Sequence, residues 1–274
     1  MGKALVWTRF RHEGKVKSEG GEAQGWGVRI TFEAMKPVLF ALPLLLLTAC
    51  GPTSESAPTT MEETAPTDPW APLARYLSER EAEFDQIPAE RQVELDAIGE
   101  FVRTARDTGA AQLTFICTHN SRRSHFGQVW AQVAAHHLGI DSLVTTYSGG
   151  TEATAFNDRA VAALRRAGLD IHPAEIGENT KYAVHYAEDR DPLLCFSKKY
   201  DDATVNPTGG FAAVMTCSEA DKGCPVVYGS AARFAIPYVD PKVSDGTPEE
   251  RDTYDARCAQ IAREMLYAMA VAAR

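Results

Sequence analysis

Residues 113–124 read Leu-Thr-Phe-Ile-Cys-Thr-His-Asn-Ser-Arg-Arg-Ser, and the rest of the chain can be interpreted around them. The run from Leu113 to Ile116 is apolar and β-prone, which predicts a short buried strand that ends at Cys117. Five residues separate Cys117 from Arg123, and a helical pattern of apolar residues begins directly afterwards and stops at Gly139. The sequence therefore predicts a strand, a tight loop and a helix in immediate succession.

Such a unit predicts a site for an anion. The backbone N–H groups of a tight loop and the N-terminus of the following helix both favour negative charge. Arg123 adds a two-pronged donor for an oxyanion, and the same field favours the reactive thiolate form of Cys117. A lone cysteine after a strand is often only a small buried hydrophobe, but the arginine, the hydroxyl after it and the helix start favour a catalytic loop. We expect Cys117 to be the nucleophile and Arg123 to hold the anion together with the other residues of the loop: Thr118, His119, Asn120, Ser121, Arg122 and Ser124.

Residues 113–124 resemble the catalytic loop of the low-molecular-weight protein tyrosine phosphatase and arsenate reductase superfamily. Residues 147–152 and the run from Asn157 to Ile171 are similar to the second structural unit of the same superfamily. The resemblance implies a three-layer α/β sandwich with a mainly parallel sheet of about four strands, and a cysteine that attacks phosphorus or arsenic. His119 and Arg122 depart from the family pattern, which often has Gly and Cys at these places.

Other patterns predict the remaining elements. Apolar stripes between Trp70 and Asp107 predict an N-terminal extension of two helices, to which we assign no chemistry. Lys198 and Lys199 follow a predicted hairpin that is inserted into the family fold, and we interpret them as a solvated strand end rather than an anion site. The other expected elements are strands over 142–147, 210–216 and 234–239, a tight turn over 148–151, a helix over 159–167, hairpin strands over 182–186 and 192–197, and a final helix from about 246 to 270.

A second pair of cysteines flanks a six-residue polar segment. Cys217 ends a predicted strand, and Cys224 is followed by a proline. The segment is similar to the redox loop of the thioredoxin-coupled arsenate reductases, which implies that the two thiols relay electrons to an external dithiol such as a thioredoxin-like protein. A static structural disulfide remains the alternative. Cys195 and Cys258 have no role that the sequence suggests.

Asp240-Pro241 follows the last predicted strand. A carboxyl group there can face Cys117 across a pocket and protonate a departing oxygen, as an Asp-Pro pair does in the superfamily. Tyrosine phosphatases usually have an aromatic residue next, whereas this chain has Lys242. We therefore prefer arsenate reduction, with a phosphomonoester hydrolase as the first alternative and a non-catalytic oxyanion-binding surface lipoprotein as the second.

The N-terminal part of the sequence predicts export. Residues 1–34 suggest an upstream mis-start or a disordered segment, and residues 35–49 combine a short basic flank with an apolar run of signal-peptide length. The tetrapeptide that ends at Cys50 resembles a bacterial lipobox, which implies lipid attachment at Cys50, and an uncleaved anchor is the alternative. Residues 50–69 read as a flexible tether, and residues 111–274 as the catalytic domain. We expect a membrane-anchored lipoprotein on the periplasmic side of the outer membrane.

Charge and residue spacing narrow the classes of ligand. Residues 1–49 hold seven Lys and Arg against four Asp and Glu, so the remainder, with 21 basic and 33 acidic residues, has a balance of −12. A domain so acidic is a poor candidate for binding nucleic acid. We expect no cofactor and no metal, and we interpret four histidines as ordinary loop or surface residues, because none forms a pair with metal-ligand spacing beside a carboxylate: His119, His125, His172 and His185.

Overall fold

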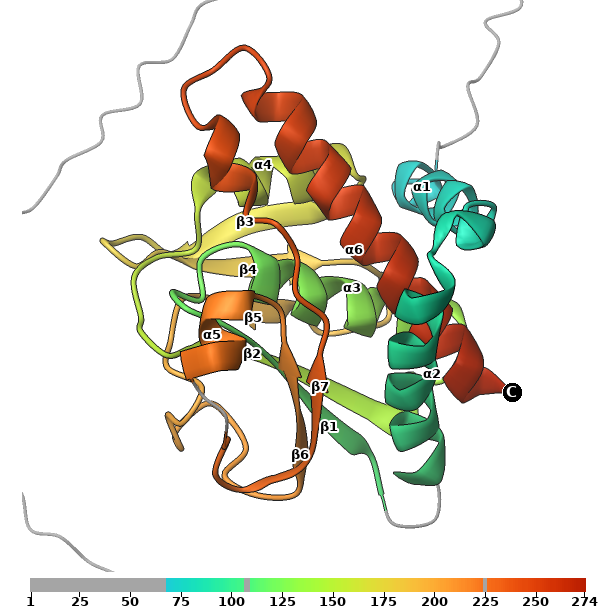
Figure 1. Cartoon of the computed structure of the whole chain (residues 1–274). Coiled ribbons are helices and arrows are strands. Elements are labelled where there is room, and N and C mark those ends of the chain that lie inside the picture. Colours follow the sequence, from blue (N-terminus) through green and yellow to red (C-terminus); the bar gives the residue numbers. More distant parts are fainter. Residues whose placement is uncertain (1–67, 106–108, 224–225) are drawn as a thin grey trace, which may run out of the picture. The chain divides into compact units, whose positions relative to one another are not determined.

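The computed structural model describes residues 68–105, 109–223 and 226–274 (Figure 1). Several predictions fall outside the described residues: the signal peptide, the lipidation site Cys50, nearly all of the tether, and Cys224 of the second cysteine pair. The described residues all fall in one compact unit, Glu62–Arg274. None of the helices in this part of the chain has the length and apolar character that crossing a membrane requires.

A four-stranded sheet, all of its pairs parallel, forms the centre of the domain. Its strands are β1 (Ala111–Cys117), β2 (Val144–Gly150), β6 (Phe211–Met215) and β7 (Ser230–Ala235), in the order β2-β1-β6-β7. Ile116 is in register with Met215, so the chain leaves β1 and β6 at the same edge, where Cys117 and Cys217 follow. The predicted α/β fold with a mainly parallel sheet of about four strands is confirmed.

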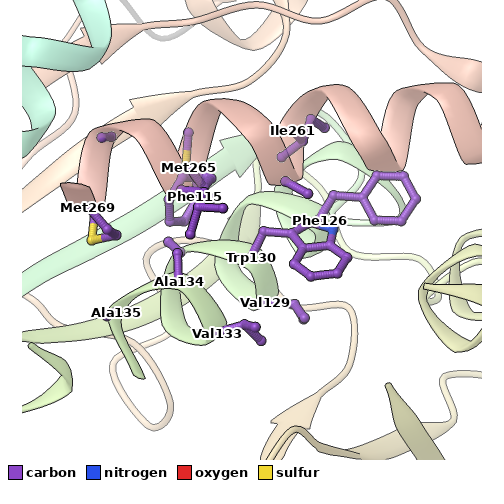
Figure 2. Packing of buried hydrophobic residues seen from close by; sticks show 14 of the residues in the cluster. Phe115, Phe126, Val129, Trp130, Val133, Ala134, Ala135, Ile261, Met265 and Met269 are labelled. Carbon is purple, nitrogen blue, oxygen red and sulfur yellow. The ribbon is translucent and has the colours of Figure 1, made fainter. Parts of the chain in front are cut away.

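Helices α3 (Arg123–His137) and α6 (Glu250–Ala273) cover one face of this sheet. Every α3 residue from Arg123 to Ala135 is buried, because the helix lies between the sheet and α6. Figure 2 shows the apolar side chains of α3 packed under Ile261, Met265 and Met269 of α6. The opposite face has a thinner cover, which consists of the short helix α5 (Ser218–Gly223) and irregular chain around a small cluster that includes Cys117, Phe211 and Cys217.

The N-terminal extension consists of α1 (Ala71–Glu81), the 3-10 turn η1 (Phe84–Gln86) and α2 (Ala89–Thr104), as the apolar stripes predict. Both helices pack on α6, and α2 also reaches β7 (Figure 1). Tyr76 of α1 stacks on Trp130 of α3, with ring centroids 5.2 Å apart. Leu95, Ile98 and Val102 of α2 are fully buried, so the extension shares the main hydrophobic core of the domain.

A second, antiparallel sheet has the strand order β3-β4-β5. Strands β4 (Lys181–His185) and β5 (Leu193–Cys195) are the predicted hairpin, and β3 (Asp170–Glu175) is an additional strand beside β4. Helix α4 (Asp158–Arg166) precedes β3 and is capped by the Asn157 side chain, which accepts a hydrogen bond from the Arg159 N–H.

Three sequence-based boundaries are wrong. The predicted strand over 142–147 begins only at Val144, after the 3-10 turn η3 (Asp141–Leu143), and includes most of the predicted turn, because Ser148–Gly150 pair with the buried end of β1. The last strand ends at Ala235 rather than near 239, so Asp240 follows an irregular segment. The polar segment after Cys217 is not an open loop but helix α5, whose Asp221 N–H bonds the Cys217 carbonyl.

Candidate active site

The loop between β1 and α3 has its carbonyl groups turned outward. The Cys117 carbonyl accepts from the Thr151 N–H at 3.1 Å and the Thr118 carbonyl from the Glu152 N–H at 2.8 Å. The carbonyls of His119 and Ser121 are bonded to the Ser197 hydroxyl and to the Asn157 N–H. In a planar trans peptide the N–H points opposite to the carbonyl. The loop interior therefore receives the N–H groups of Thr118, His119, Asn120 and Arg122, as an anion site requires.

Asn120 fixes the shape of this loop. It is fully buried and has a φ of 44°, in the left-handed region that Asn tolerates better than most residues. Its side-chain oxygen accepts from the Lys198 N–H at 2.9 Å, and its amide nitrogen donates to the Ser124 hydroxyl at 2.9 Å. The Ser124 hydroxyl lies 3.1 Å from the Cys117 sulfur. Because Asn120 already supplies the hydrogen of the first bond, the hydroxyl is free to donate to Cys117, which stabilises a thiolate.

Arg123 connects the loop to the predicted acid. The side chain is nearly buried, and it donates to the Tyr238 carbonyl at 3.0 Å and to the Asp240 carboxylate at 2.8 Å. Asp240 also caps the 3-10 turn η4 (Pro241–Ser244) by accepting from the Lys242 N–H at 3.1 Å. Asp240 is therefore held in the same ion-pair network as Arg123, the predicted anion-binding residue.

Arg122 has partners that the sequence did not suggest. Its Nε donates to the Tyr254 hydroxyl at 2.7 Å, and its guanidinium lies 3.5 Å from Asp245 and 3.9 Å from Asp240. Tyr254 in turn donates to Asp245 at 2.8 Å, and burial raises the pKa of this tyrosine to about 12. The hydroxyl therefore stays protonated and fixes Arg122 between the loop and α6. Tyr254 has only an apolar helical spacing in the sequence, so this polar role had no sequence signal.

Cys217 lies beside the catalytic loop. It is fully buried at the start of α5, its sulfur lies 3.5 Å from the Thr118 hydroxyl, and it accepts from the Ala220 N–H at 3.3 Å. Thr118 is the residue after Cys117, so the second thiol borders the first. The position of Cys224 lies outside the described residues.

His125 and Lys198 are not surface residues, which corrects their sequence-based interpretation. His125 is fully buried, stacks on Phe156 at 3.9 Å between ring centroids, and lies 3.3 Å from the Ser148 hydroxyl through Nδ1. The Lys198 amine lies 3.4 Å from the same hydroxyl and 3.3 Å from the Phe196 carbonyl. Burial lowers the pKa of both groups, and the positive charge of Lys198 lowers that of His125 further. Lys198 is also joined to the loop directly, because its backbone N–H donates to the Asn120 side chain.

The other predicted residues lie at the periphery. His119 is half-buried and faces Glu152 at 3.5 Å, and His172 pairs with Asp170 on the surface. Burial raises the pKa of the Cys195 and Cys258 thiols to about 12 in each case, which makes them unreactive. Among the described residues, no three His, Cys, Asp or Glu side chains are grouped so as to hold a metal ion.

Known proteins are similar to part of this chain, which includes the loop between β1 and α3. A family model for the low molecular weight phosphotyrosine protein phosphatase matches residues 112–184. Arsenate reductase from Bacillus licheniformis is 31% identical over 137 residues, which are 50% of this chain and 78% of the relative, and arsenate reductase from Bacillus subtilis is 30% identical over the same shares. A crystal structure of a low molecular weight phosphotyrosine phosphatase from Vibrio cholerae aligns with 58% of this chain and 94% of its own, at 11% identity and a TM-score of 0.38.

Proposed function

The chain belongs to the superfamily of low-molecular-weight phosphotyrosine phosphatases and arsenate reductases, and on this premise we propose that it is a thiol-dependent arsenate reductase. Cys117 attacks arsenate that is held by the loop N–H groups and Arg123. Asp240 protonates the departing hydroxyl, which leaves as water while a sulfur–arsenic bond forms.

The second step transfers two electrons. Cys217 attacks the Cys117 sulfur, a disulfide forms, and the electron pair of the sulfur–arsenic bond reduces As(V) to As(III), which departs as arsenite. Cys224 then attacks the Cys217 sulfur and frees Cys117. An external dithiol, such as that of a thioredoxin-like protein, reduces the resulting Cys217–Cys224 disulfide and restores the starting state.

The observation that carries this proposal is the place of Cys217. A hydrolase needs no second thiol, yet Cys217 is buried against the loop with its sulfur 3.5 Å from Thr118. The strand ends that carry the two cysteines are neighbours, because β1 pairs with β6 up to Ile116 and Met215. A buried thiol that receives a backbone N–H bond is better placed for attack as a thiolate than one in apolar surroundings.

Replacement of Cys224 tests the relay. Cys224→Ser should release one equivalent of arsenite per enzyme and then stop, whereas the wild type should turn over with a thioredoxin couple. Cys195→Ser, at a buried cysteine outside the relay, is the control and should turn over like the wild type. Unimpaired steady-state turnover by Cys224→Ser would contradict the relay.

A phosphomonoester hydrolase is the second candidate. The observation in its favour is that Cys117 pairs with Ser124 and Arg123 pairs with Asp240, two contacts to which Cys217 contributes no atom. Phosphate release from an aryl phosphate that persists in a Cys217→Ser variant, with no arsenite formed from arsenate, would support the hydrolase against the reductase.

We also propose that the protein is exported and anchored by lipid at Cys50, on the evidence of residues 35–50 alone. Labelled palmitate should be incorporated into the wild type and not into Cys50→Ser when both are expressed in a Gram-negative host. Equal labelling of the two proteins would contradict the anchor.

A further inference from the structure

We infer that Arg91, on the N-terminal helix α2, is a positioning residue that holds the segment carrying Asp240 in its active geometry. We call residues 236–240 the acid segment, since they connect β7 to η4 and end at the proposed acid. The inference rests on the proposed role of Asp240. Arg91 precedes the residues that the family model matches, so it belongs to the extension rather than to that part of the fold.

Arg91 makes two direct contacts with the acid segment. One guanidinium nitrogen donates to the Pro237 carbonyl at 2.9 Å. The guanidinium also lies over the Tyr238 ring, 5.4 Å from its centroid, where a cation is attracted by the face of the ring. On its own helix Arg91 pairs with Glu94 at 2.7 Å, which holds the side chain in this direction. The Arg91 guanidinium thus joins α2 to Pro237 and Tyr238, two consecutive residues of the acid segment.

A third contact runs through a buried carboxylate on α6. Arg91 Nε lies 3.5 Å from Glu264, which is 1% exposed, and the Tyr238 hydroxyl donates to the same carboxylate oxygen at 2.8 Å. Gln260 donates to the other oxygen at 2.9 Å. A buried carboxylate that loses its cation is destabilised, so Arg91 also stabilises the acceptor that fixes the Tyr238 ring.

The contacts lead directly to the site. The Tyr238 carbonyl accepts from Arg123 at 3.0 Å, and the Tyr238 N–H bonds the Thr216 carbonyl at the end of the sheet. Asp240 lies two residues further and pairs with the same Arg123. When Tyr238 shifts, the Asp240 carboxylate must shift with it, whereas Arg123 keeps its place at the start of α3. Arg91 therefore acts on the reaction through Tyr238 and not by touching the substrate.

Hydrogen exchange tests the placement without any need for turnover. We compare the wild type with Arg91→Ala, with Arg91→Lys, and with Arg103→Ala as a control on the same helix, where Arg103 pairs with Glu100 at the surface. Arg91→Ala should raise the exchange rate of the Tyr238 and Lys242 amides about tenfold, corresponding to about 1.4 kcal/mol. The Lys variant should show a smaller increase and Arg103→Ala none. Unchanged exchange at both amides in Arg91→Ala would overturn the inference.

Kinetics separate positioning from a loss of folding. With arsenate or an aryl phosphate, Arg91→Ala should lower kcat about tenfold and leave KM within about twofold, because the ground-state anion contacts remain. In an Asp240→Asn background the same substitution should add nothing, since the group that it positions is already lost. A tenfold loss that persists in that background would contradict the inference. Absence of turnover in the wild type would instead refute the proposed function, and the exchange experiment would still decide the role of Arg91.

Discussion

The Ser124 hydroxyl lies 3.1 Å from the Cys117 sulfur, and the bond that it accepts from Asn120 leaves its own hydrogen for that sulfur. One buried asparagine thus sets both the backbone of the loop between β1 and α3 and the direction of the hydroxyl that faces Cys117. This arrangement ties the reactivity of Cys117 to the fold of the loop rather than to an adjacent base.

Ser124→Ala removes the donor to the Cys117 sulfur. A hydrogen bond to a charged group contributes about 1.5–3 kcal/mol, so kcat should fall by about 10- to 150-fold. The rate of Cys117 alkylation by iodoacetamide at pH 6 should fall with it. Ser78→Ala, which removes an exposed hydroxyl on α1, is the matched control and should change neither rate. Equal alkylation of Ser124→Ala and wild type would show that the hydroxyl does not stabilise the thiolate.

Gly150→Ala should disturb the anion loop from the neighbouring strand. A Cβ at this position would lie 2.7 Å from both the Asn120 nitrogen and the Thr118 carbonyl oxygen, which are backbone atoms of the loop. Overpacking of this kind costs about 1–3 kcal/mol, so arsenate should protect Cys117 from alkylation at about 5- to 150-fold higher concentration. Gly209→Ala, where a Cβ meets open space, should bind arsenate like the wild type. If arsenate protected Gly150→Ala and Gly209→Ala at the same concentration, a Cβ at position 150 would not disturb the loop.

The buried His125 predicts a loss of stability in mild acid. Its pKa in the folded state is well below the ordinary value of 6.5, because it is buried beside Lys198, so the unfolded chain binds a proton that the folded chain does not. The contribution of this group to the free energy of unfolding is fully present well above pH 6.5. It declines as the pH falls below 6.5, with a slope that approaches about 1.4 kcal/mol per pH unit.

Urea unfolding between pH 7 and pH 5 measures this effect. His125→Gln should show a shallower decline in the free energy of unfolding over this range than the wild type, even though its stability at pH 7 is lower. His172→Gln, at an exposed histidine, should keep the slope of the wild type. An identical slope in His125→Gln would show that His125 does not carry the effect.

The central unit could be predicted from the sequence because its signals are local. An apolar strand, the Cys117 to Arg123 spacing and a helix start fall within a short run of residues, and they agree with β1, the loop and α3. The parallel sheet was expected from the resemblance of residues 113–124 and 147–152 to the superfamily. The ends of the strands could not be predicted in this way. The Ser148–Gly150 segment has a turn-like sequence and becomes a strand only through its pairing with β1.

The polar groups around the loop depend on contacts between distant residues. The local sequence around Lys198 does not show whether the side chain is solvated or buried. Its burial depends on packing against Ser148, which is distant in the sequence. Tyr254 and Arg91 lie on helices whose apolar stripes describe packing and not polar partners. Their contacts with Arg122 and Pro237 join residues more than 100 positions apart, which no local pattern records.

The most direct test of the reductase mechanism is a single turnover without any external reductant. Fully reduced wild type and Cys217→Ser are each mixed with excess arsenate, and the arsenite formed per enzyme is counted. Cys258→Ser is the control, because this thiol is buried on α6, where a hydroxyl can still accept from Trp130. The mechanism predicts one equivalent of arsenite from wild type and control, and none from Cys217→Ser. One equivalent from Cys217→Ser would contradict it.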